Sequence, residues 1–484
     1  MLERQELFIA SRWAKPQGND WLEVVSPITE KVFGRVPLAT PDDVDVAVAA
    51  ARTAFAEGPW RRMSVAERGE VLLRAADILQ GQVDDMAHLQ IDEMGSPLAF
   101  MGPITGAAVA SIRAEVAEMV AFPTAELRDG PAGKVLVEKI PVGVVVAIIP
   151  WNAPVHSLIG RMVTPLLAGC SVIAKPAPES PLSCYHVAEA LLQAGLPEGV
   201  LSIIPGGVEV GERMVSHPGV DRISFTGSTV AGARVASLAA DSFKSVTLEL
   251  GGKSAAILLD DADLGQHLPR IIESSLPNNG QLCFATTRLL VPESRHNEVV
   301  DAVVDAVSAM RVGNPHDAGV AVGPLAARRQ RDRVERYLDL GRSEGATVAV
   351  GGGRPADLDT GWFIEPTVFT GVTPDMTIAR EEIFGPVLSV LRYTDDDHAV
   401  QLANDSEYGL GGAVFTDDLD RGLAVARQVT TGTCRINEAP PGGGGGPFGG
   451  VRRSGLGRER AREGRDNCYV LRSIALPKGF IPTV

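Results

Sequence analysis

The feature of this sequence that most constrains its fold is a series of short apolar runs that are rich in β-branched residues. Such runs are apolar on both faces, which is typical of parallel strands covered by helices on each side of a sheet. Amphipathic helical patterns separate them, as in residues 184–196. The alternation predicts a doubly wound α/β fold. The runs are VGVVVAII (142–149), SVIAKP (171–176), LSIIPG (201–206), DRISFTG (221–227), SVTLELGG (245–252) and SAAILLD (254–260).

The length of the chain and the order of its patterns predict more than one domain. With 484 residues the chain exceeds the size at which a single hydrophobic core stops growing, so we expect two or three domains. Thr40 before Pro41, and a capping box formed by Ser64 and Glu67, mark the starts of two helices. A second α/β region begins after Gly252. Its helical pattern and strand-like runs are residues 296–310, 345–352 and 385–393.

Charge and cysteine usage exclude several classes of function. A formal net charge of −15 disfavours nucleic acid and an anionic membrane surface as partners. The five cysteines are spread out without a Cys-x-x-Cys pair, and no histidine spacing indicates a zinc site. Residues 1–15 lack the apolar core of a signal peptide, and the apolar run at 142–150 is far below the ~20 residues that span a bilayer. We therefore expect a soluble, cytoplasmic protein without a metal site.

Two strand ends have the form of nucleotide-binding turns. In SFTGSTVAG (224–232) a strand runs into a Gly-Ser turn and a helix that begins near Thr229, so free N–H groups can bind an anion such as a pyrophosphate. In VIAKPAPES (172–180), Lys175 ends a parallel strand, where such sheets bind ligands. Each feature also has a plainer interpretation: an ordinary turn between strand and helix, and a solvated lysine.

Three further segments carry side chains suited to covalent chemistry. PWNAP (150–154) presents the Asn152 amide from a rigid turn, as an oxyanion site requires, unless Asn152 simply caps the next segment. Glu249 in TLELGGK (247–253) ends an apolar strand and is either a general base with a raised pKa or a salt-bridged residue. Cys283 in NNGQLCFATTR (278–288) is either a nucleophile or an inert, buried cysteine, which is the commoner case.

Taken in order, these motifs resemble one known family. PWNAP, KPAPE, FTGSTVAG, LELGGK, GQLCFATTR, EEIFGPV, YGLGGAVFT and PFGGVRRSGLGRE follow one another as the motifs of the aldehyde dehydrogenase superfamily do. The resemblance extends from FIASRW (8–13) to YVLRSIALP (469–477), which is nearly the whole chain. Eight ordered motifs make chance agreement implausible, and the chain is identified as a member of this superfamily.

The resemblance implies a three-part architecture. Residues 1–123 and 142–250 would form a Rossmann-like cofactor-binding domain, and residues 251–449 an α/β catalytic domain. Residues 124–141 and 466–484 would form a small β oligomerisation unit. In family members the strands of this unit extend the sheet of a neighbour, so the resemblance implies a homodimer or a homotetramer.

The resemblance also assigns the catalytic residues. Cys283 matches the nucleophile that attacks the aldehyde carbonyl as a thiolate, and the Asn152 amide and the backbone N–H of Cys283 would hold the oxyanion. A hydride then passes to the nicotinamide and leaves a thioester on Cys283. Glu249 matches the general base that activates water to hydrolyse this thioester. Glu459 matches a residue of the proton relay in some members.

Cofactor binding departs from the family pattern at one position. Many members have a glutamate three residues after the lysine, which bonds both ribose hydroxyls and repels a 2′-phosphate. Here Pro178 stands at that position and the carboxylate comes one residue later, at Glu179, so we expect NAD but keep NADP open. The cofactor-binding residues that the resemblance implies are Trp151, Lys175, Glu179, Gly227, Ser228, Glu382 and Phe384.

The residues expected along the substrate tunnel form a small group and a bulky group. Ala153, Ser157 and Gly160 are small where family members often carry larger residues, which suggests a wide entrance and a larger or aromatic aldehyde. Leu282 and Phe284 flank the nucleophile and would form the wall. A glycine-rich loop that includes residues 442–448 would complete the tunnel, and we expect it to be a mobile surface loop. Arg161 stands where a lysine is frequent, and the sequence does not indicate its effect.

Two rival functions remain at this stage. A CoA-acylating dehydrogenase would transfer the acyl group to CoA instead of water, but such members generally lack the general-base glutamate that is present here as Glu249. A non-catalytic cofactor-binding scaffold would have no chemical reason to keep Cys283, Glu249 and Asn152 together. The leading prediction is an NAD(P)-dependent oxidoreductase that converts a small-molecule aldehyde, of unspecified identity, into a carboxylic acid.

Overall fold

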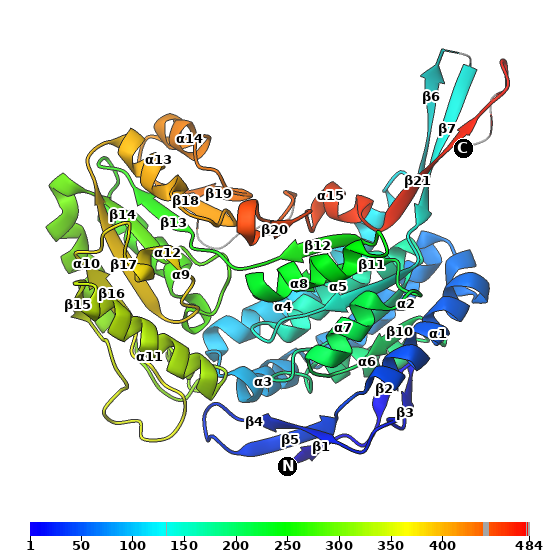
Figure 1. The fold of residues 1–484 in the computed structure, drawn as a ribbon, viewed down its shortest axis with the longest axis horizontal. Helices are drawn as coiled ribbons and strands as arrows, with labels where there is room; N and C mark the ends of the chain where they lie inside the picture. Colours follow the sequence, from blue (N-terminus) through cyan, green and yellow to red (C-terminus); the bar gives the residue numbers. More distant parts are fainter. Residues whose placement is uncertain (132, 439–444, 481, 483–484) are drawn as a thin grey trace.

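The strands expected between residues 142 and 252 belong to one eight-stranded sheet (Figure 1). The structure is a computed structural model that describes residues 1–131, 133–438, 445–480 and 482. The five central strands of this sheet are parallel, and the edge strands pair antiparallel. Sequence patterns did not predict these edge strands, because two or three residues are too few for a periodicity. In spatial order the strands are β20 (Gly455–Leu456), β12 (Ser245–Glu249), β11 (Arg222–Thr226), β8 (Val144–Ile148), β9 (Ser171–Lys175), β10 (Leu201–Ile203), β2 (Leu7–Ile9) and β3 (Arg12–Ala14).

Helices cover both faces of this sheet, as strands that are apolar on both faces require. The two helix starts predicted from the sequence are confirmed, since Thr40 caps α1 and Ser64 forms a capping box with Glu67 at the start of α2. The helices of one face are α2 (Val65–Gln80), α4 (Leu98–Val120), α5 (Pro154–Ala168) and α6 (Cys184–Gln193), with α3 (Val83–Met94) packed against α4. The helices of the other face are α1 (Pro41–Glu57), α7 (Val208–Ser216) and α8 (Thr229–Ala240).

A second, seven-stranded sheet follows in the chain and is parallel except for its edge strand β15. Its strands are β15 (Thr347–Val350), β16 (Thr367–Thr370), β17 (Val387–Tyr393), β14 (Arg288–Pro292), β13 (Ala255–Leu258), β18 (Gly411–Phe415) and β19 (Thr433–Ile436). The helices on its two faces are α9 (Leu264–Ser275) and α10 (His296–Ser308) on one, and α11 (Arg328–Ser343), α12 (Thr377–Arg380), α13 (Asp396–Asn404) and α14 (Leu419–Ala426) on the other. The two sheets confirm the predicted α/β class.

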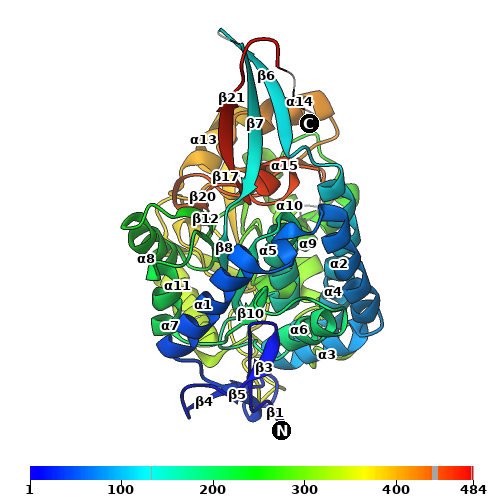
Figure 2. The ribbon, with the colours of Figure 1, turned by 90° about the vertical axis from the view of Figure 1, so that its right-hand side faces the viewer.

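Two small sheets complete the molecule. The strand β21 (Tyr469–Ala475), which follows α15 (Ala461–Asp466), pairs antiparallel with β7 (Gly133–Pro141) of the hairpin formed with β6 (Ala125–Gly130). This three-stranded sheet projects from the body of the molecule (Figures 1 and 2). The other small sheet contains β1 (Leu2–Glu3), β5 (Val32–Pro37) and β4 (Trp21–Val25). Within the described ranges, none of the helices has the length and apolar character that crossing a membrane requires.

Candidate active site

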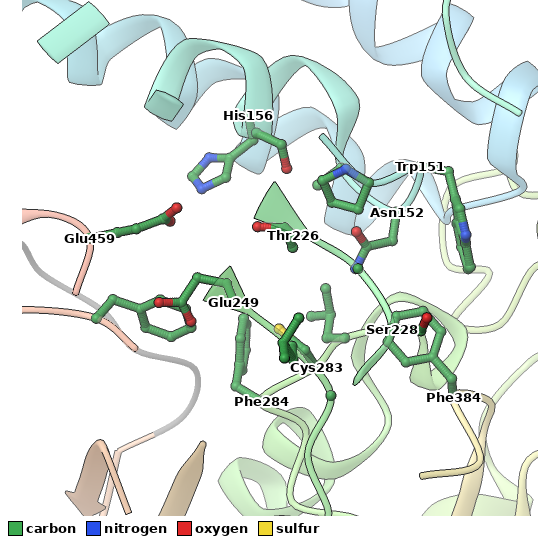
Figure 3. A pocket seen from close by; sticks show the side chains of 18 of the residues that line it. Trp151, Asn152, His156, Thr226, Ser228, Glu249, Cys283, Phe284, Phe384 and Glu459 are labelled. Atoms are coloured by element: carbon green, nitrogen blue, oxygen red, sulfur yellow. The ribbon is translucent and has the colours of Figure 1, made fainter. Parts of the chain in front are cut away.

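A cavity of about 560 Å³ lies where the carboxyl ends of β8, β11 and β12 face the loop that precedes β14. Such strand ends are where open α/β sheets bind their ligands. The cavity gathers the site residues expected from the sequence except Lys175, Glu179 and the tunnel residue Gly160. In Figure 3, Cys283 lies between Trp151, Ser228 and Phe384 on one side and His156 and Glu459 on the other. The expected residues in its lining are Trp151, Asn152, Ala153, Ser157, Gly227, Ser228, Glu249, Leu282, Cys283, Phe284, Glu382, Phe384 and Glu459.

A strained turn holds the loop that carries the cysteine. Asn278, Asn279 and Gly280 have φ angles of 51°, 58° and 71°, so three consecutive residues are in the left-handed region. The Asn279 side-chain amide donates to the carbonyl oxygens of Gly95 and Pro324, each at 2.9 Å, and compensates for this strain. At Gly280 a Cβ atom would lie 2.0 Å from the carbonyl oxygen of Gly385, so only glycine fits there. The turn is therefore fixed by contacts with distant segments.

The Asn152 amide lies beside this loop. Its Nδ2 donates to the carbonyl oxygen of Gln281 at 2.7 Å, while Nδ2 of Asn278 donates to the Asn152 carbonyl at 2.9 Å. An amide NH₂ has two hydrogens, so one N–H of Asn152 remains for an oxygen in the cavity. The backbone N–H of Cys283 makes no hydrogen bond to the residues that the structure describes. The site thus has two donors from different segments for one oxyanion.

The thiol of Cys283 is half-buried and neutral in the resting protein. Burial, followed by the negative charges of Glu382 and Glu249, raises its pKa to about 12. A thiol in this environment is inert until a base or a nearby positive charge favours the thiolate. A buried thiol with a raised pKa is typical of an inert cysteine, so Cys283 is identified as a nucleophile only together with its neighbours.

The carboxyl group of Glu249 is buried at the end of β12 with only 1% of the residue exposed. Neither of its oxygens has a hydrogen-bond partner among the described residues. Burial, and then the nearby charge of Glu459, raises its pKa to about 9. Gly449 keeps the space beside it open, because a Cβ there would lie 2.6 Å from Oε1 of Glu249. An uncompensated carboxyl group in a cavity is costly and typical of a functional site.

Arg161 has a clear role in the structure. Its Nη2 lies 3.1 Å from Oε2 of Glu459 and also bonds the Thr226 hydroxyl. The Ser224 hydroxyl donates to the other oxygen of Glu459 at 3.3 Å. Glu459 is also fixed by its backbone, which forms a bridge with Phe448. Arg161 therefore holds the Glu459 carboxylate at the edge of the cavity, opposite the Trp151 end.

The other end of the cavity fits a nicotinamide nucleotide. Trp151 and Phe384 meet edge to face with ring centroids 5.4 Å apart, and Oε1 of Glu382 accepts from the N–H of Gly252 at 3.1 Å. Phe384 keeps a left-handed φ of 63°, and Gln330 bonds its carbonyl oxygen at 2.5 Å. Ser228 caps α8, whose N-terminus follows β11 directly. Helix N-termini with unpaired N–H groups bind phosphates, so the residues present suit the cofactor.

The whole chain resembles one group of known enzymes. A family model described as the aldehyde dehydrogenase family matches residues 13–474. The chain belongs to the aldehyde dehydrogenase family.

Individual relatives agree with this assignment over nearly their full length. The chain is 44% identical over 464 residues to geranial dehydrogenase of Castellaniella defragrans, which covers 96% of each chain. It is 38% identical over 486 residues to an aminoaldehyde dehydrogenase of Arabidopsis thaliana, with 98% of this chain and 96% of the relative covered. The structure of a Mycobacterium tuberculosis aldehyde dehydrogenase complexed with NAD⁺ has a TM-score of 0.97 at 43% identity, covering 99% of this chain and 100% of that one. The protein is an NAD-dependent oxidoreductase that converts an aldehyde into a carboxylic acid.

Two expected cofactor residues of this dehydrogenase lie outside the cavity lining. Lys175 ends β9 and is buried next to Gly211 of α7, and this burial lowers its pKa to about 8. Glu179 forms an ion pair with the exposed Arg329 of α11, so a residue from a helix of the second sheet occupies its carboxylate. Sequence patterns do not reveal this pair, since the partners are 150 positions apart. A ribose-binding role for these two residues stays a prediction.

Sequence patterns also missed several residues in the cavity of the dehydrogenase. Phe100, Ile104 and Ala107 of α4 line it, and their spacing places them on one helix face. The helix carries many other apolar residues, so this face could not be distinguished from a core face. His156 and Arg460 also line the cavity. The only available signal was their position in the chain, four residues after Asn152 and directly after Glu459. Part of the predicted tunnel loop, residues 442–444, lies outside the described residues.

Proposed function

We propose that this dehydrogenase works through a covalent thioester on Cys283. The observation that carries the proposal is that Cys283 shares one cavity with the free N–H of Asn152 and the uncompensated carboxyl group of Glu249. After the thiol has given its proton to water, the thiolate sulfur attacks the carbonyl carbon, and the carbonyl oxygen becomes an oxyanion that accepts from Asn152 Nδ2 and from the N–H of Cys283. NAD, when bound, accepts the hydride that leaves this carbon. Cys283 then carries the acyl group as a thioester.

Glu249 is proposed to complete the reaction. In its ionised form it takes a proton from water, whose oxygen attacks the thioester carbon and releases the acid and the free thiol. Its raised pKa makes it a stronger base than an ordinary glutamate. Glu459, held by Arg161 and Ser224, would pass the proton on toward solvent. Hydrolysis of this kind leaves no step for CoA.

The assignment of parts and of cofactor residues is also a proposal. Residues 1–123 and 142–250 would bind NAD, residues 251–449 would supply the nucleophile, and residues 124–141 with 466–484 would join subunits. Trp151, Gly227, Ser228, Glu382 and Phe384 would hold the nicotinamide half and the phosphates. The edge-to-face pair of Trp151 and Phe384 and the capped N-terminus of α8 support this placement. Lys175 and Glu179 would contact the adenosine ribose.

We further propose that the protein forms a homodimer or homotetramer through the projecting sheet. Its edge strand β21 exposes Val470, Leu471 and Ile474, which are 51%, 66% and 38% accessible. Exposed apolar residues on a free sheet edge are typical of strands that pair with a second chain. The five unpaired cysteines support a cytoplasmic, reducing location.

A panel of aldehydes tests the proposed function. With NAD and without CoA, we expect NADH and the carboxylic acid in equal amounts, and a lower kcat/KM when NADP replaces NAD. The reason for the second expectation is that a 2′-phosphate beside Glu179 would have to disrupt the ion pair between Glu179 and Arg329 or be repelled by the carboxylate. Both quantities are measured by NADH absorbance and by chromatography of the acid. Strict dependence on CoA would contradict the hydrolytic step.

Replacing Asn152 by alanine tests the oxyanion site. We expect kcat to fall roughly 10²- to 10³-fold, because one fixed donor to the oxyanion is lost. Since Asn152 also bonds the Gln281 carbonyl, the loop could shift instead. Alkylation of Cys283 by iodoacetamide separates the two effects: a parental alkylation rate shows that the nucleophile is in place. A kcat within threefold of the parent would exclude Asn152 from the oxyanion site.

A further inference from the structure

The substrate end of the cavity carries a positive charge that no acidic residue neutralises. Arg161 is matched by Glu459, at 3.1 Å. The next residue, Arg460, lines the same cavity and forms no ion pair with any residue that the structure describes. Glu249, the other acid of this end, is protonated near neutral pH because its pKa is raised. The end of the cavity that receives the substrate is therefore positive.

The Arg460 guanidinium is held at this end by two neighbours. Its Cζ lies 5.1 Å from the centre of the Phe448 ring, which is a cation–π contact. Its Nη2 lies 3.3 Å from Nε2 of His156. The residue has a φ of 62°, and it is exposed to solvent as well as to the cavity, so it stands at the mouth. The side chain is therefore directed by contacts and is available to a ligand that enters.

His156 provides no acceptor at the same place. A guanidinium can only donate, so Nε2 of His156 accepts from Arg460 and its proton is on Nδ1. This Nδ1 is buried and has no partner among the described residues. Burial, together with the charges of Arg460 and Arg161, lowers the pKa of His156 to about 4, so the ring is neutral. Arg460 therefore offers hydrogens to a ligand, and neither side chain offers it a free acceptor.

The lining of the cavity beside Cys283 is apolar. Phe284 and Phe448 meet edge to face with ring centroids 6.2 Å apart, and Phe100 and Ile104 of α4 add apolar side chains to the same cavity. An apolar passage with donors at its far end fits a ligand with an apolar body and an oxygen acceptor opposite its reacting group. A cationic group at that position would be repelled by Arg460 and would find no acceptor.

We propose that Arg460 determines substrate specificity: it favours aldehydes whose far end carries a carboxylate or another oxygen acceptor, and it disfavours cationic aldehydes. The inference rests on the proposed function, since it concerns the substrate of the same site. The proposed preference differs from the substrates in the names of two relatives, an aminoaldehyde dehydrogenase and a betaine aldehyde dehydrogenase.

Three aldehydes of matched shape test this selection. Benzaldehyde is neutral, 4-carboxybenzaldehyde is anionic, and 4-(trimethylammonio)benzaldehyde is cationic, on the same ring. The quantity to measure is the kcat/KM of each charged aldehyde relative to benzaldehyde, in the parent and in Arg460→Gln. Substituents also change the reactivity of the carbonyl group, but this effect cancels when the variant is compared with the parent.

In Arg460→Gln we expect the ratio of kcat/KM for 4-carboxybenzaldehyde to kcat/KM for 4-(trimethylammonio)benzaldehyde to fall about tenfold. The change should come mainly from a higher KM for the carboxylate, since a partly exposed charge contact is lost. In Arg460→Glu the fall should be larger, and Arg460→Lys should restore most of the ratio. Arg462→Gln is the matched control, because this arginine is 73% exposed, lies outside the cavity lining and should leave the ratio unchanged.

The outcomes are distinguishable. Suppose that benzaldehyde is oxidised but that Arg460→Gln and Arg460→Glu have the same carboxy-to-trimethylammonio ratio of kcat/KM as the parent. The role of Arg460 in substrate specificity is then overturned, and the proposed function stands. If the parent oxidises none of the three aldehydes, and none of a wider panel, the proposed function fails and this inference fails with it. A ratio that also changes in Arg462→Gln would indicate a general surface-charge effect and would overturn the assignment to Arg460.

Discussion

Replacing Cys283 by alanine is expected to lower kcat on the order of 10⁴-fold or more, because the reaction loses its only covalent carrier of the acyl group. Without the sulfur, the aldehyde carbon cannot form the tetrahedral adduct from which a hydride leaves. The oxyanion donors and the cofactor site remain, so binding alone would give a small residual rate. NADH formation with the best aldehyde of the panel measures the loss.

A matched control separates this effect from damage to the fold. Cys434 of β19 is also half-buried, burial raises the pKa of its thiol to about 11, and it does not line the cavity. Cys434→Ala should keep kcat within about twofold, whereas Cys283→Ala should keep NAD binding but lose oxidation. If Cys283→Ala oxidises any aldehyde at the parental rate, the covalent route is excluded.

Local patterns were sufficient for the parts of the fold that depend on local interactions. The caps Thr40 and Ser64 act within one turn of their helices, and the predicted strands that end at Lys175 and Glu249 end there in the structure. A strand covered on both faces must be apolar throughout, which is a property of its own residues. Such features can be predicted because their causes lie within a few positions in the sequence.

The site itself depends on contacts between distant segments, which single-sequence patterns do not contain. The turn before Cys283 is fixed by Asn279, whose partners at Gly95 and Pro324 lie 184 and 45 positions away. The motif order gave the position of Cys283 only through a family resemblance. It gave no indication of the Arg329 partner of Glu179 or of the Arg161 contact to Glu459, because each pair forms only when the two sheets and the C-terminal segment pack together.

Replacing Glu249 by glutamine should separate the two halves of the reaction. The first turnover forms NADH and the Cys283 thioester, neither of which requires Glu249 as the base for water. Hydrolysis then slows roughly 10²- to 10⁴-fold, which is the usual contribution of a positioned general base. Rapid mixing should therefore show a burst of NADH close to one equivalent per active site, followed by almost no turnover. Acid quenching should trap the acyl group on Cys283.

The pH dependence of the parent provides a second test of the same residue. Glu249 acts as a base only when it is ionised, and its pKa is about 9 instead of the ordinary 4.5. The rate of thioester hydrolysis in the parent should therefore rise as the pH increases from 7 toward 9 and then level off. In Glu249→Gln this rise should be absent, since glutamine does not titrate. A profile with the same rise in the variant would assign the titration to another group, such as the Cys283 thiol.

The raised pKa also predicts that Glu249 reduces the stability of the folded protein. The folded state binds this proton more tightly than the unfolded chain does, so the contribution of Glu249 to stability is most favourable below about pH 4.5 and becomes less favourable as the pH rises toward 9. Glutamine has nearly the same shape and no charge to bury, and it should raise the midpoint of thermal unfolding at pH 8 but leave it unchanged near pH 4.5. Glu273→Gln is the matched control, because this glutamate is exposed, lies outside the cavity lining and has no ion pair among the described residues. If Glu249→Gln is inactive and also less stable than the parent at pH 8, the carboxylate stabilises the fold. Its burial would then have a structural reason, and the assignment of Glu249 as the catalytic base would be overturned.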